Sequence, residues 1–161
     1  MIDEESFKNA MRRLAAGVSI ITAVKDIERY GILVTSVISV SAAPPSLLIS
    51  INQKSSVHDP INDTDCFCVS LLDQSQFEIA RHFSSTKPRD RRFEIGRWTT
   101  LSTGAPALDG ALVSLDCHVA AKFPMHSHTL FVGEIVEAKH WVDAIHPLVY
   151  LNGQFLEQQF S

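Results

Sequence analysis

The sequence is short of cysteine, and this shortage limits the chemistry that it can support. Only three cysteines occur in 161 residues, at positions 66, 68 and 117, and none forms a C-x-x-C pair. Cys66 and Cys68 are too close along one strand for a mutual disulfide and too few for a zinc site. We therefore interpret the cysteines as small apolar residues of a core.

Long apolar runs and an excess of positive charge are also lacking. No apolar run approaches the roughly 20 residues that a membrane-spanning helix needs. The first five residues are acidic, whereas a secretion signal begins with basic residues and continues with apolar ones. The formal net charge of −4 offers no basic surface for nucleic acid. We expect a cytoplasmic protein that binds neither membranes nor nucleic acid.

The composition is otherwise that of a globular protein. Hydrophobic residues make up 45% of the chain and charged residues 20%, which excludes a disordered chain. A chain of this length is expected to form a single domain over residues 1–161, with roughly 70% of its unfolded surface buried. No G-x-G-x-x-G motif follows a predicted strand, so the dinucleotide-binding fingerprint of a parallel α/β sheet is missing.

Hydrophobic periodicity predicts many strands and few helices. We expect helices over residues 3–15, 56–62 and 75–83, the last opened by a capping box between Ser75 and Glu78. Residues 87–92 are expected to be a loop, and Pro124 is expected to interrupt a strand. The expected strands cover residues 18–24, 32–40, 46–52, 66–72, 111–123, 129–139 and 148–151. This pattern favours a β-barrel.

The most informative stretch runs from Gly31 to Ser56. Alternate residues from Ile32 to Val40 are mostly apolar, which predicts one strand with a buried face and a face of hydroxyls. Pro44-Pro45 cannot donate to a strand ladder, so the chain should turn there. In the strand that follows, Ser50 and Asn52 share the polar face. The two strands thus bring hydroxyls and an amide towards a common surface.

A candidate anion site follows, where Lys54 stands beside Ser55 and Ser56 at a predicted helix start. Phosphate binds hydroxyl and N–H donors together with a cation, and helix N-termini supply oriented N–H groups. The pattern suits a phosphorylated heterocycle. From the pattern alone, however, polar residues that face solvent on a half-exposed strand are the preferred interpretation.

The histidines offer a second candidate for chemistry. His126 and His128 would place two imidazoles on one side of an extended segment, but a metal site needs a third ligand and the sequence suggests none. No Ser-His-Asp or Cys-His arrangement is present. The sequence therefore predicts neither a metal centre nor a nucleophilic enzyme.

A resemblance to a known family resolves part of this ambiguity. The stretch from Gly31 reads G-x-x-V-T-S-V-x-S-V-S-x-x-P-P-S-L-L-x-S-I-N-x-x-S-S. It resembles the short flavin reductases that serve two-component flavin-dependent monooxygenases, such as the reductases of 4-hydroxyphenylacetate 3-monooxygenases. The similarity continues in order through Arg81–Phe83, Gly104–Leu108, His128–Glu134 and Pro147–Tyr150, and so covers nearly the whole chain.

The resemblance implies a mainly β fold, the FMN-binding split β-barrel with a few flanking helices, and a homodimer. It implies an NAD(P)H:flavin oxidoreductase that reduces FMN or FAD with NADH or NADPH and supplies reduced flavin to a separate oxygenase component. Hydride transfer to the flavin needs no protein nucleophile. Two alternatives stay open: a flavin-dependent reductase of another acceptor, such as a corrin or a ferric chelate, and a non-catalytic flavin- or haem-binding module.

The same resemblance implies the site residues. His128 is expected beside the nicotinamide, and Lys54, Ser55 and Ser56 are expected to hold the flavin phosphate. Residues 123–127 depart from the family pattern, so the resemblance does not determine the shape of this loop or the access of the nicotinamide to the site. The remaining residues expected at the flavin are Thr35, Ser36, Val37, Ser50, Ile51 and Asn52.

Overall fold

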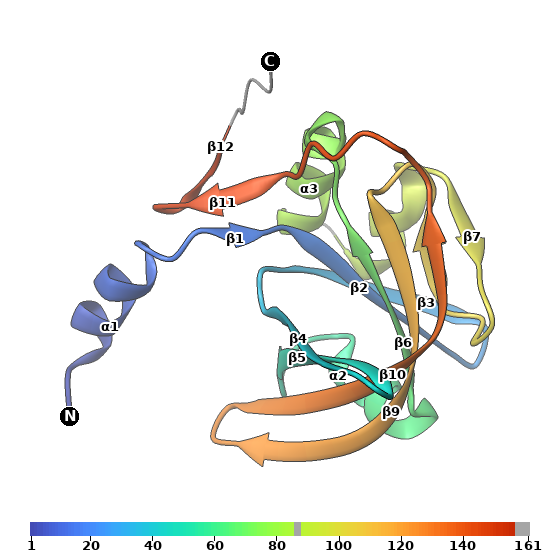
Figure 1. The fold of residues 1–161 in the computed structure, drawn as a ribbon. Coiled ribbons are helices and arrows are strands. Elements are labelled where there is room, and N and C mark those ends of the chain that lie inside the picture. The colour runs from blue at the N-terminus through green and yellow to red at the C-terminus, as the bar shows by residue number, and fades with distance from the viewer. Residues whose placement is uncertain (86–87, 157–161) are drawn as a thin grey trace.

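The computed structural model describes residues 1–85 and 88–156, which form mostly β-strands (Figure 1). None of the helices in these ranges is long and apolar enough to span a membrane. The helices are α1 (Glu4–Met11), α2 (His58–Thr64) and α3 (Phe77–Ser84), with 3₁₀ helices η1 (Gln74–Gln76) and η2 (Arg89–Glu94). The strands are β1 (Ala16–Gly17), β2 (Ser19–Lys25), β3 (Glu28–Val34), β4 (Val37–Ala42), β5 (Pro45–Asn52), β6 (Cys66–Leu71), β7 (Trp98–Thr100), β8 (Pro106–Leu108), β9 (Val113–Met125), β10 (His128–His140), β11 (Val149–Leu151) and β12 (Gln154–Leu156).

Seven strands form one antiparallel sheet in the order β3-β2-β6-β9-β10-β5-β4. Its two edge strands, β3 and β4, are consecutive in the chain and are joined only by Thr35 and Ser36. Such a short link brings the two edges together at one end, so the sheet curls into a barrel that is closed there (Figure 1). Closure protects edges that would otherwise be open to pairing with other chains. The mainly β split-barrel prediction is confirmed.

The prediction of one continuous strand over residues 32–40 is wrong. The chain pairs with β2 up to Val34, crosses at Thr35–Ser36 to the opposite edge of the sheet, and then pairs with β5. The crossing also shifts the alternation, because Val37 packs against the core while Ile38 and Val40 are 61% and 52% exposed. Both halves of residues 32–40 are strands, as the alternation predicted, but they form opposite edges of the sheet.

The core prediction for β5 is confirmed. Leu47, Ile49 and Ile51 are buried inside the barrel, where Phe67 of β6 and Phe131 of β10 pack with them. A second apolar cluster lies under α3, which buries Ala80 and Phe83 there. Burying these side chains contributes about 1.5–3 kcal/mol for each large one, which fixes the positions of β5 and β10.

The prediction that the cysteines are core residues is confirmed for Cys68 and Cys117 and is wrong for Cys66. Cys68 and Cys117 are fully buried, and Cys66 is half-buried. Burial raises the pKa of the Cys117 thiol to about 12 and also raises the pKa of Cys68 and Cys66. Cys68 and Cys117 are therefore protonated core residues, whereas Cys66 lies outside the core with its Sγ 3.2 Å from His118 Nδ1.

Pro124 does not interrupt its strand. β9 continues to Met125, with Pro124 opposite Thr129 of β10. Beyond His118, β9 pairs with β10 alone within the described sheet, since β6 ends its pairing there. A proline is tolerated because the missing N–H can fall on the side that has no neighbour.

The capping box predicted between Ser75 and Glu78 lies two residues earlier. The Asp73 side chain accepts from Ser75 N at 2.8 Å, and the Gln76 side chain accepts from Asp73 N at 3.1 Å. Asp73 begins a 3₁₀ turn, and α3 follows at Phe77. Aspartate satisfies free N–H groups at a helix start as well as serine does, and Asp73 takes that role here.

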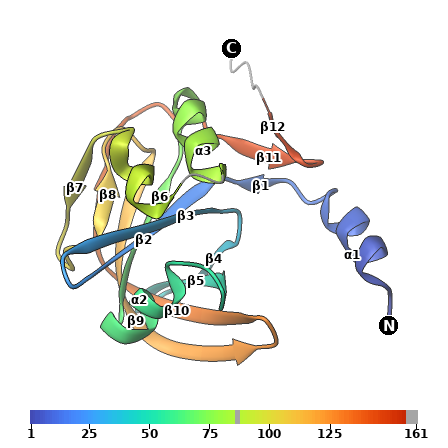
Figure 2. The ribbon, with the colours of Figure 1, turned by 180° about the vertical axis from the view of Figure 1, so that it is seen from behind.

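Helix α1 is shorter than expected and packs least with the rest of the chain. It ends at Met11 rather than near Ala15, and none of its residues is buried. It projects away from the barrel in both views (Figures 1 and 2). Its apolar residues Phe7 and Met11, with Leu14 beyond its end, are therefore exposed.

Candidate functional site

A cavity of about 560 Å³ opens where the two edges of the sheet meet. This is within the range of about 300–1,000 Å³ that is typical of small-molecule sites. Its wall combines the end of β3, the link to β4, the ends of β5 and β10, and the β11–β12 hairpin. The lining residues are Ile32, Leu33, Val34, Thr35, Ser36, Ser50, Asn52, Ser84, His128, Tyr150, Gly153, Gln154 and Phe155.

Five of the residues predicted from the sequence line this cavity: Thr35, Ser36, Ser50, Asn52 and His128. Strand pairing explains how they meet, because Asn52 lies opposite His128 in the β5–β10 ladder. The Ser36 hydroxyl donates to the Ser50 backbone oxygen at 3.0 Å, which holds the link against β5. Hydroxyls and an amide thus face one hollow, although the alternation from Ile32 placed Ser36 on the core face; the crossing at Thr35–Ser36 brings it to the cavity.

Two other predicted residues face the core instead of the cavity. The Ile51 side chain is fully buried, and Val37 packs against the same core cluster. Only their backbone groups remain for a ligand.

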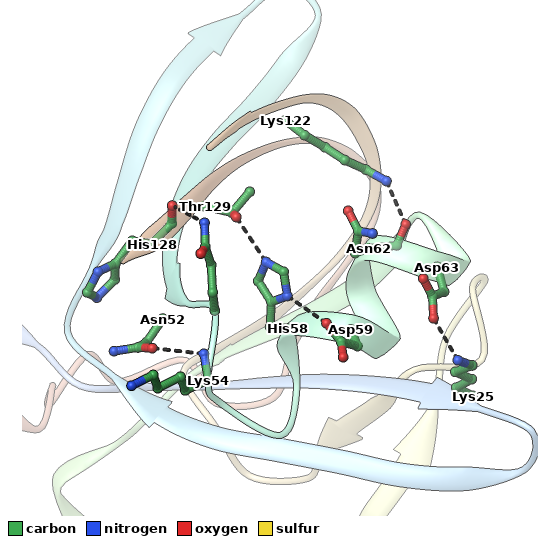
Figure 3. A network of polar contacts seen from close by, with 11 residues as sticks. Lys25, Asn52, Lys54, His58, Asp59, Asn62, Asp63, Lys122, His128 and Thr129 are labelled. Carbon is green, nitrogen blue, oxygen red and sulfur yellow. Dashed lines mark hydrogen bonds and ion pairs between the residues drawn. The ribbon is translucent and has the colours of Figure 1, made fainter. Parts of the chain in front are cut away.

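The three residues of the predicted phosphate site lie in the turn after β5. α2 begins at His58, so the expectation of a helix start at Ser55 or Ser56 is wrong by two residues or more. The Asn52 side chain caps the turn by accepting from Lys54 N at 2.9 Å (Figure 3). This bond between residues two positions apart stabilises a turn at Lys54, and α2 therefore begins later in the chain than expected.

This turn carries features that fit an anionic group. The Ser55 hydroxyl is buried and has no hydrogen-bond partner among the described residues, which is unusual for a buried polar atom. The Lys54 ammonium forms no ion pair within the described ranges, and Lys54 and Ser56 are both exposed. The side chains of Lys54, Asn52 and His128 point the same way in Figure 3.

His128 begins β10 and is half-buried at the cavity wall. Its Nδ1 lies 2.8 Å from the Ser127 hydroxyl, and its backbone oxygen accepts from Gln53 Nε2 at 3.1 Å. His126 occupies the tip of the β9–β10 hairpin with a positive φ of 54°. The prediction that His126 and His128 share one side of an extended segment is therefore wrong. No three metal-binding side chains cluster anywhere in the described ranges.

The β11–β12 hairpin is the part of the cavity wall that sequence reasoning missed. Its turn, Asn152-Gly153, has positive φ at both residues, 52° and 79°. Asn-Gly is the strongest short signal for a hairpin, so this element was open to prediction. Tyr150 and Phe155 flank the turn with ring centroids 5.5 Å apart and supply an aromatic wall.

The arginines after α3 serve the fold. Residues 89–94 form η2 rather than the expected loop, and Phe93 is buried against the core. Arg89 pairs with Glu28 at 2.6 Å, and Arg92 Nη1 donates to the Gly31 backbone oxygen at 2.7 Å. These contacts fix the segment against β3, so Arg89 and Arg92 are engaged within the fold.

The barrel and its cavity define a small-molecule-binding protein of the split-barrel class. The model of the family described as "Flavin reductase like domain" matches residues 11–158, and the chain belongs to this family. The FMN reductase (NADH) RutF of Pantoea ananatis (strain LMG 20103) is 34% identical over 154 residues, which cover 96% of this chain and 80% of that protein.

Two solved structures show the same fold. BorF, the flavin reductase component of a bacterial two-component tryptophan halogenase, is 29% identical with a TM-score of 0.87, over 96% of this chain and 97% of that one. The NADH:FAD oxidoreductase SgcE6 of Streptomyces globisporus C-1027, in complex with NAD and FAD fragments, is 27% identical with a TM-score of 0.88, over 100% and 96% of the two chains.

Proposed function

We propose that the protein is an NADH-dependent flavin reductase that binds FMN or FAD in the cavity between β3, β5 and β10. The observation that carries the proposal is the meeting of Ser36, Ser50, Asn52 and His128 at one cavity in a member of the flavin reductase-like family. Beside the cavity lies a turn whose lysine, Lys54, is exposed and forms no ion pair with the described residues. Thr35, Ser36, Ser50 and Asn52 would hold the flavin, which when bound would supply the acceptor for a hydride from NADH. The chain's own task is to bind and orient the two nucleotides.

The polar residues of the cavity suit the flavin ring edge and its ribityl chain. Thr35, Ser36, Ser50 and Asn52 offer hydroxyl, amide and backbone groups there, while Val37 and Ile51 offer backbone groups. The apolar wall from Tyr150 to Phe155 provides a surface for a planar ring. This mixture of apolar surface with a few placed polar groups is typical of cofactor sites.

Lys54, Ser55 and Ser56 are the proposed phosphate site. A lysine ammonium and serine hydroxyls are all donors to phosphate oxygens. A phosphate at this turn would give the buried Ser55 hydroxyl the partner that it lacks within the described chain. A hydrogen bond to a charged group contributes about 1.5–3 kcal/mol, so each serine would matter to affinity.

His128 is the residue proposed to hold the nicotinamide. It stands at the cavity wall, where its Nδ1 lies 2.8 Å from the Ser127 hydroxyl and its ring is thereby oriented. An imidazole can stack on the nicotinamide or bond to its carboxamide, and either contact would hold the reacting atoms close. Small misplacements of reacting atoms are costly in rate, so the role is one of orientation.

A second copy of this chain is the proposed partner of the exposed apolar surface. α1 buries none of its residues, although Phe7, Met11 and Leu14 are large and apolar. The β9–β10 hairpin, with exposed Phe123 and Met125, extends to the same side of the barrel in Figure 1. Exposed apolar groups of this kind mark interaction sites. A separate oxygenase is the proposed acceptor of the reduced flavin.

The proposed function is tested by titrating the protein with FMN and FAD and then adding NADH under nitrogen. Flavin fluorescence should quench saturably at micromolar protein, and NADH should bleach the flavin absorbance. Saturable binding without bleaching would indicate a non-catalytic module. Electron transfer to a corrin or ferric chelate, but not to free flavin, would indicate a reductase of another acceptor. Absence of saturable binding with either flavin would refute the proposal.

A further inference from the structure

The turn that carries Lys54–Ser56 is clamped at both ends against the start of β10 (Figure 3). At the near end, Gln53 N donates to the Ser127 oxygen at 2.9 Å and Gln53 Nε2 donates to the His128 oxygen at 3.1 Å. At the far end, His58 Nε2 lies 2.9 Å from Thr129 Oγ1. Three consecutive residues of the chain, 127–129, therefore hold both ends of the turn.

The far clamp has a defined geometry. His58 Nδ1 lies 2.9 Å from the Asp59 carboxylate, which can only accept, so Nδ1 carries the proton. In the neutral ring, Nε2 then accepts from the Thr129 hydroxyl. The His58 ring packs 5.6 Å from the Phe131 ring, and the side chains of His58 and Thr129 are largely buried, at 13% and 4% exposed. Each polar atom of the ring has one partner and little freedom.

We propose that His58 is a positioning residue for phosphate binding, acting through its hydrogen bond to Thr129. This inference rests on the proposed function, because it assumes that Lys54–Ser56 hold the phosphate. The bond fixes the start of α2, and with it Ser55 and Ser56, relative to the strand that carries His128. The distance between the proposed phosphate site at Lys54–Ser56 and the proposed nicotinamide site at His128 is thereby fixed.

Other contacts of the turn and helix cannot replace this bond. The β5–β10 pairing, in which Asn52 lies opposite His128, fixes only the near end of the turn. The opposite end of α2 is held by an ion pair of 2.6 Å between Lys25 and Asp63, whose side chains are 37% and 44% exposed, and by Lys122, whose Nζ donates to the Asn62 oxygen at 2.6 Å and pairs with Asp65 at 2.6 Å. Exposed pairs of this kind contribute little. Apart from the Thr129 bond, the start of α2 has, among the described residues, apolar packing and local backbone bonds from Ser55 N to the Asn52 oxygen at 2.9 Å and from His58 N to the Ser55 oxygen at 3.2 Å, and these local bonds do not reach β10.

The inference is tested with His58→Phe, which keeps a ring against Phe131, and with Thr129→Val, which keeps the shape of the side chain. Each should raise the Kd for FMN about five- to ten-fold, the effect of losing one hydrogen bond. The Kd for riboflavin, which has no phosphate, should stay within about two-fold. The double variant should bind FMN no worse than either single variant, because both remove the same bond.

Two further variants separate positioning from general stability. His58→Gln retains a polar group that reaches Thr129 and should keep FMN affinity within about three-fold of the parent protein. Asp63→Asn removes the ion pair at the other end of α2 and should leave the FMN-to-riboflavin affinity ratio unchanged. Melting temperatures measured alongside will show whether stability and affinity move together.

The outcomes are distinct. Equal losses of FMN and riboflavin affinity in both His58→Phe and Thr129→Val, or no loss in either, would overturn the inference and leave the proposed function standing. A parent protein that binds neither flavin would overturn the proposed function itself. A selective loss of FMN affinity that glutamine at position 58 restores would support the inference.

Discussion

The hydroxyl of Ser36 donates a hydrogen bond of 3.0 Å to the backbone oxygen of Ser50, and both residues line the cavity between β3, β5 and β10. Ser36 belongs to the two-residue link between the sheet edges, and Ser50 lies on β5, next to one of those edges. The same contact therefore closes the barrel and shapes the cavity. The cavity and the closure of the barrel therefore share one structural feature in this chain.

Ser36→Ala should lower the free energy of unfolding by about 1 kcal/mol, because it removes one partly buried hydrogen bond. Urea unfolding, followed by tryptophan fluorescence, measures the loss. Flavin affinity should fall in parallel, since the link loses its anchor at the cavity. Ser39→Ala on exposed β4 is the matched control and should be neutral. Identical behaviour of the two variants would contradict this account of closure.

Ser55→Ala and Ser56→Ala should each weaken FMN binding by roughly ten- to a hundred-fold, the equivalent of about 1.5–3 kcal/mol for a hydrogen bond to phosphate. Riboflavin binding should change little because riboflavin has no phosphate. Fluorescence titration with both flavins measures the difference. Equal losses for the two ligands would show that these serines serve the fold.

His128→Ala should leave FMN affinity within a few-fold but slow anaerobic flavin reduction by NADH, mainly through weaker nicotinamide binding. Stopped-flow absorbance at several NADH concentrations separates binding from the reduction step. His126→Ala is the control, because His126 lies at the exposed hairpin tip. Slower flavin reduction in the His126 variant alone would assign the nicotinamide to the hairpin tip. Unchanged reduction in both variants would show that neither histidine belongs to the site.

The protein should be a homodimer, so light scattering should return about twice the chain mass of 17.8 kDa. Leu14→Glu places a charge on the exposed apolar surface and should shift the mass towards one chain, because a buried unpaired charge is costly. Lys8→Glu is the control, because it also changes charge on α1 but replaces a residue that is already charged and exposed; this variant should remain dimeric. One chain mass for the parent protein at all concentrations would refute the dimer.

Gly133→Ala should lower the free energy of unfolding by about 1–3 kcal/mol through overpacking. A Cβ at Gly133 would lie 2.5 Å from Phe67 Cζ and 2.9 Å from Cys117 Cβ, which leaves no room without movement of the core. Gly17→Ala is the control, since nothing lies within 4 Å of a Cβ there. Thermal unfolding compares the two, and a harmless change at Gly133 would contradict the packing described for β10.

Local pattern was sufficient for much of the fold. The alternation of Leu47, Ile49 and Ile51 correctly predicted a half-buried strand, because a strand places every second side chain on the same face. Pro44-Pro45 correctly predicted the turn before it. The order of family motifs identified the split barrel, and it also pointed to Ser36, Ser50, Asn52 and His128, which do line one cavity.

Only the tertiary structure decided where those segments go. The alternation from Ile32 to Val40 cannot reveal a crossing at Thr35–Ser36, because each half looks like a strand whichever neighbour it pairs with. Nor could the sequence pair His58 with Thr129, 71 positions away, since neither residue belongs to a local motif. Hydrogen bonds between distant residues depend on how the sheet curls, and that is set by the packing of the whole barrel.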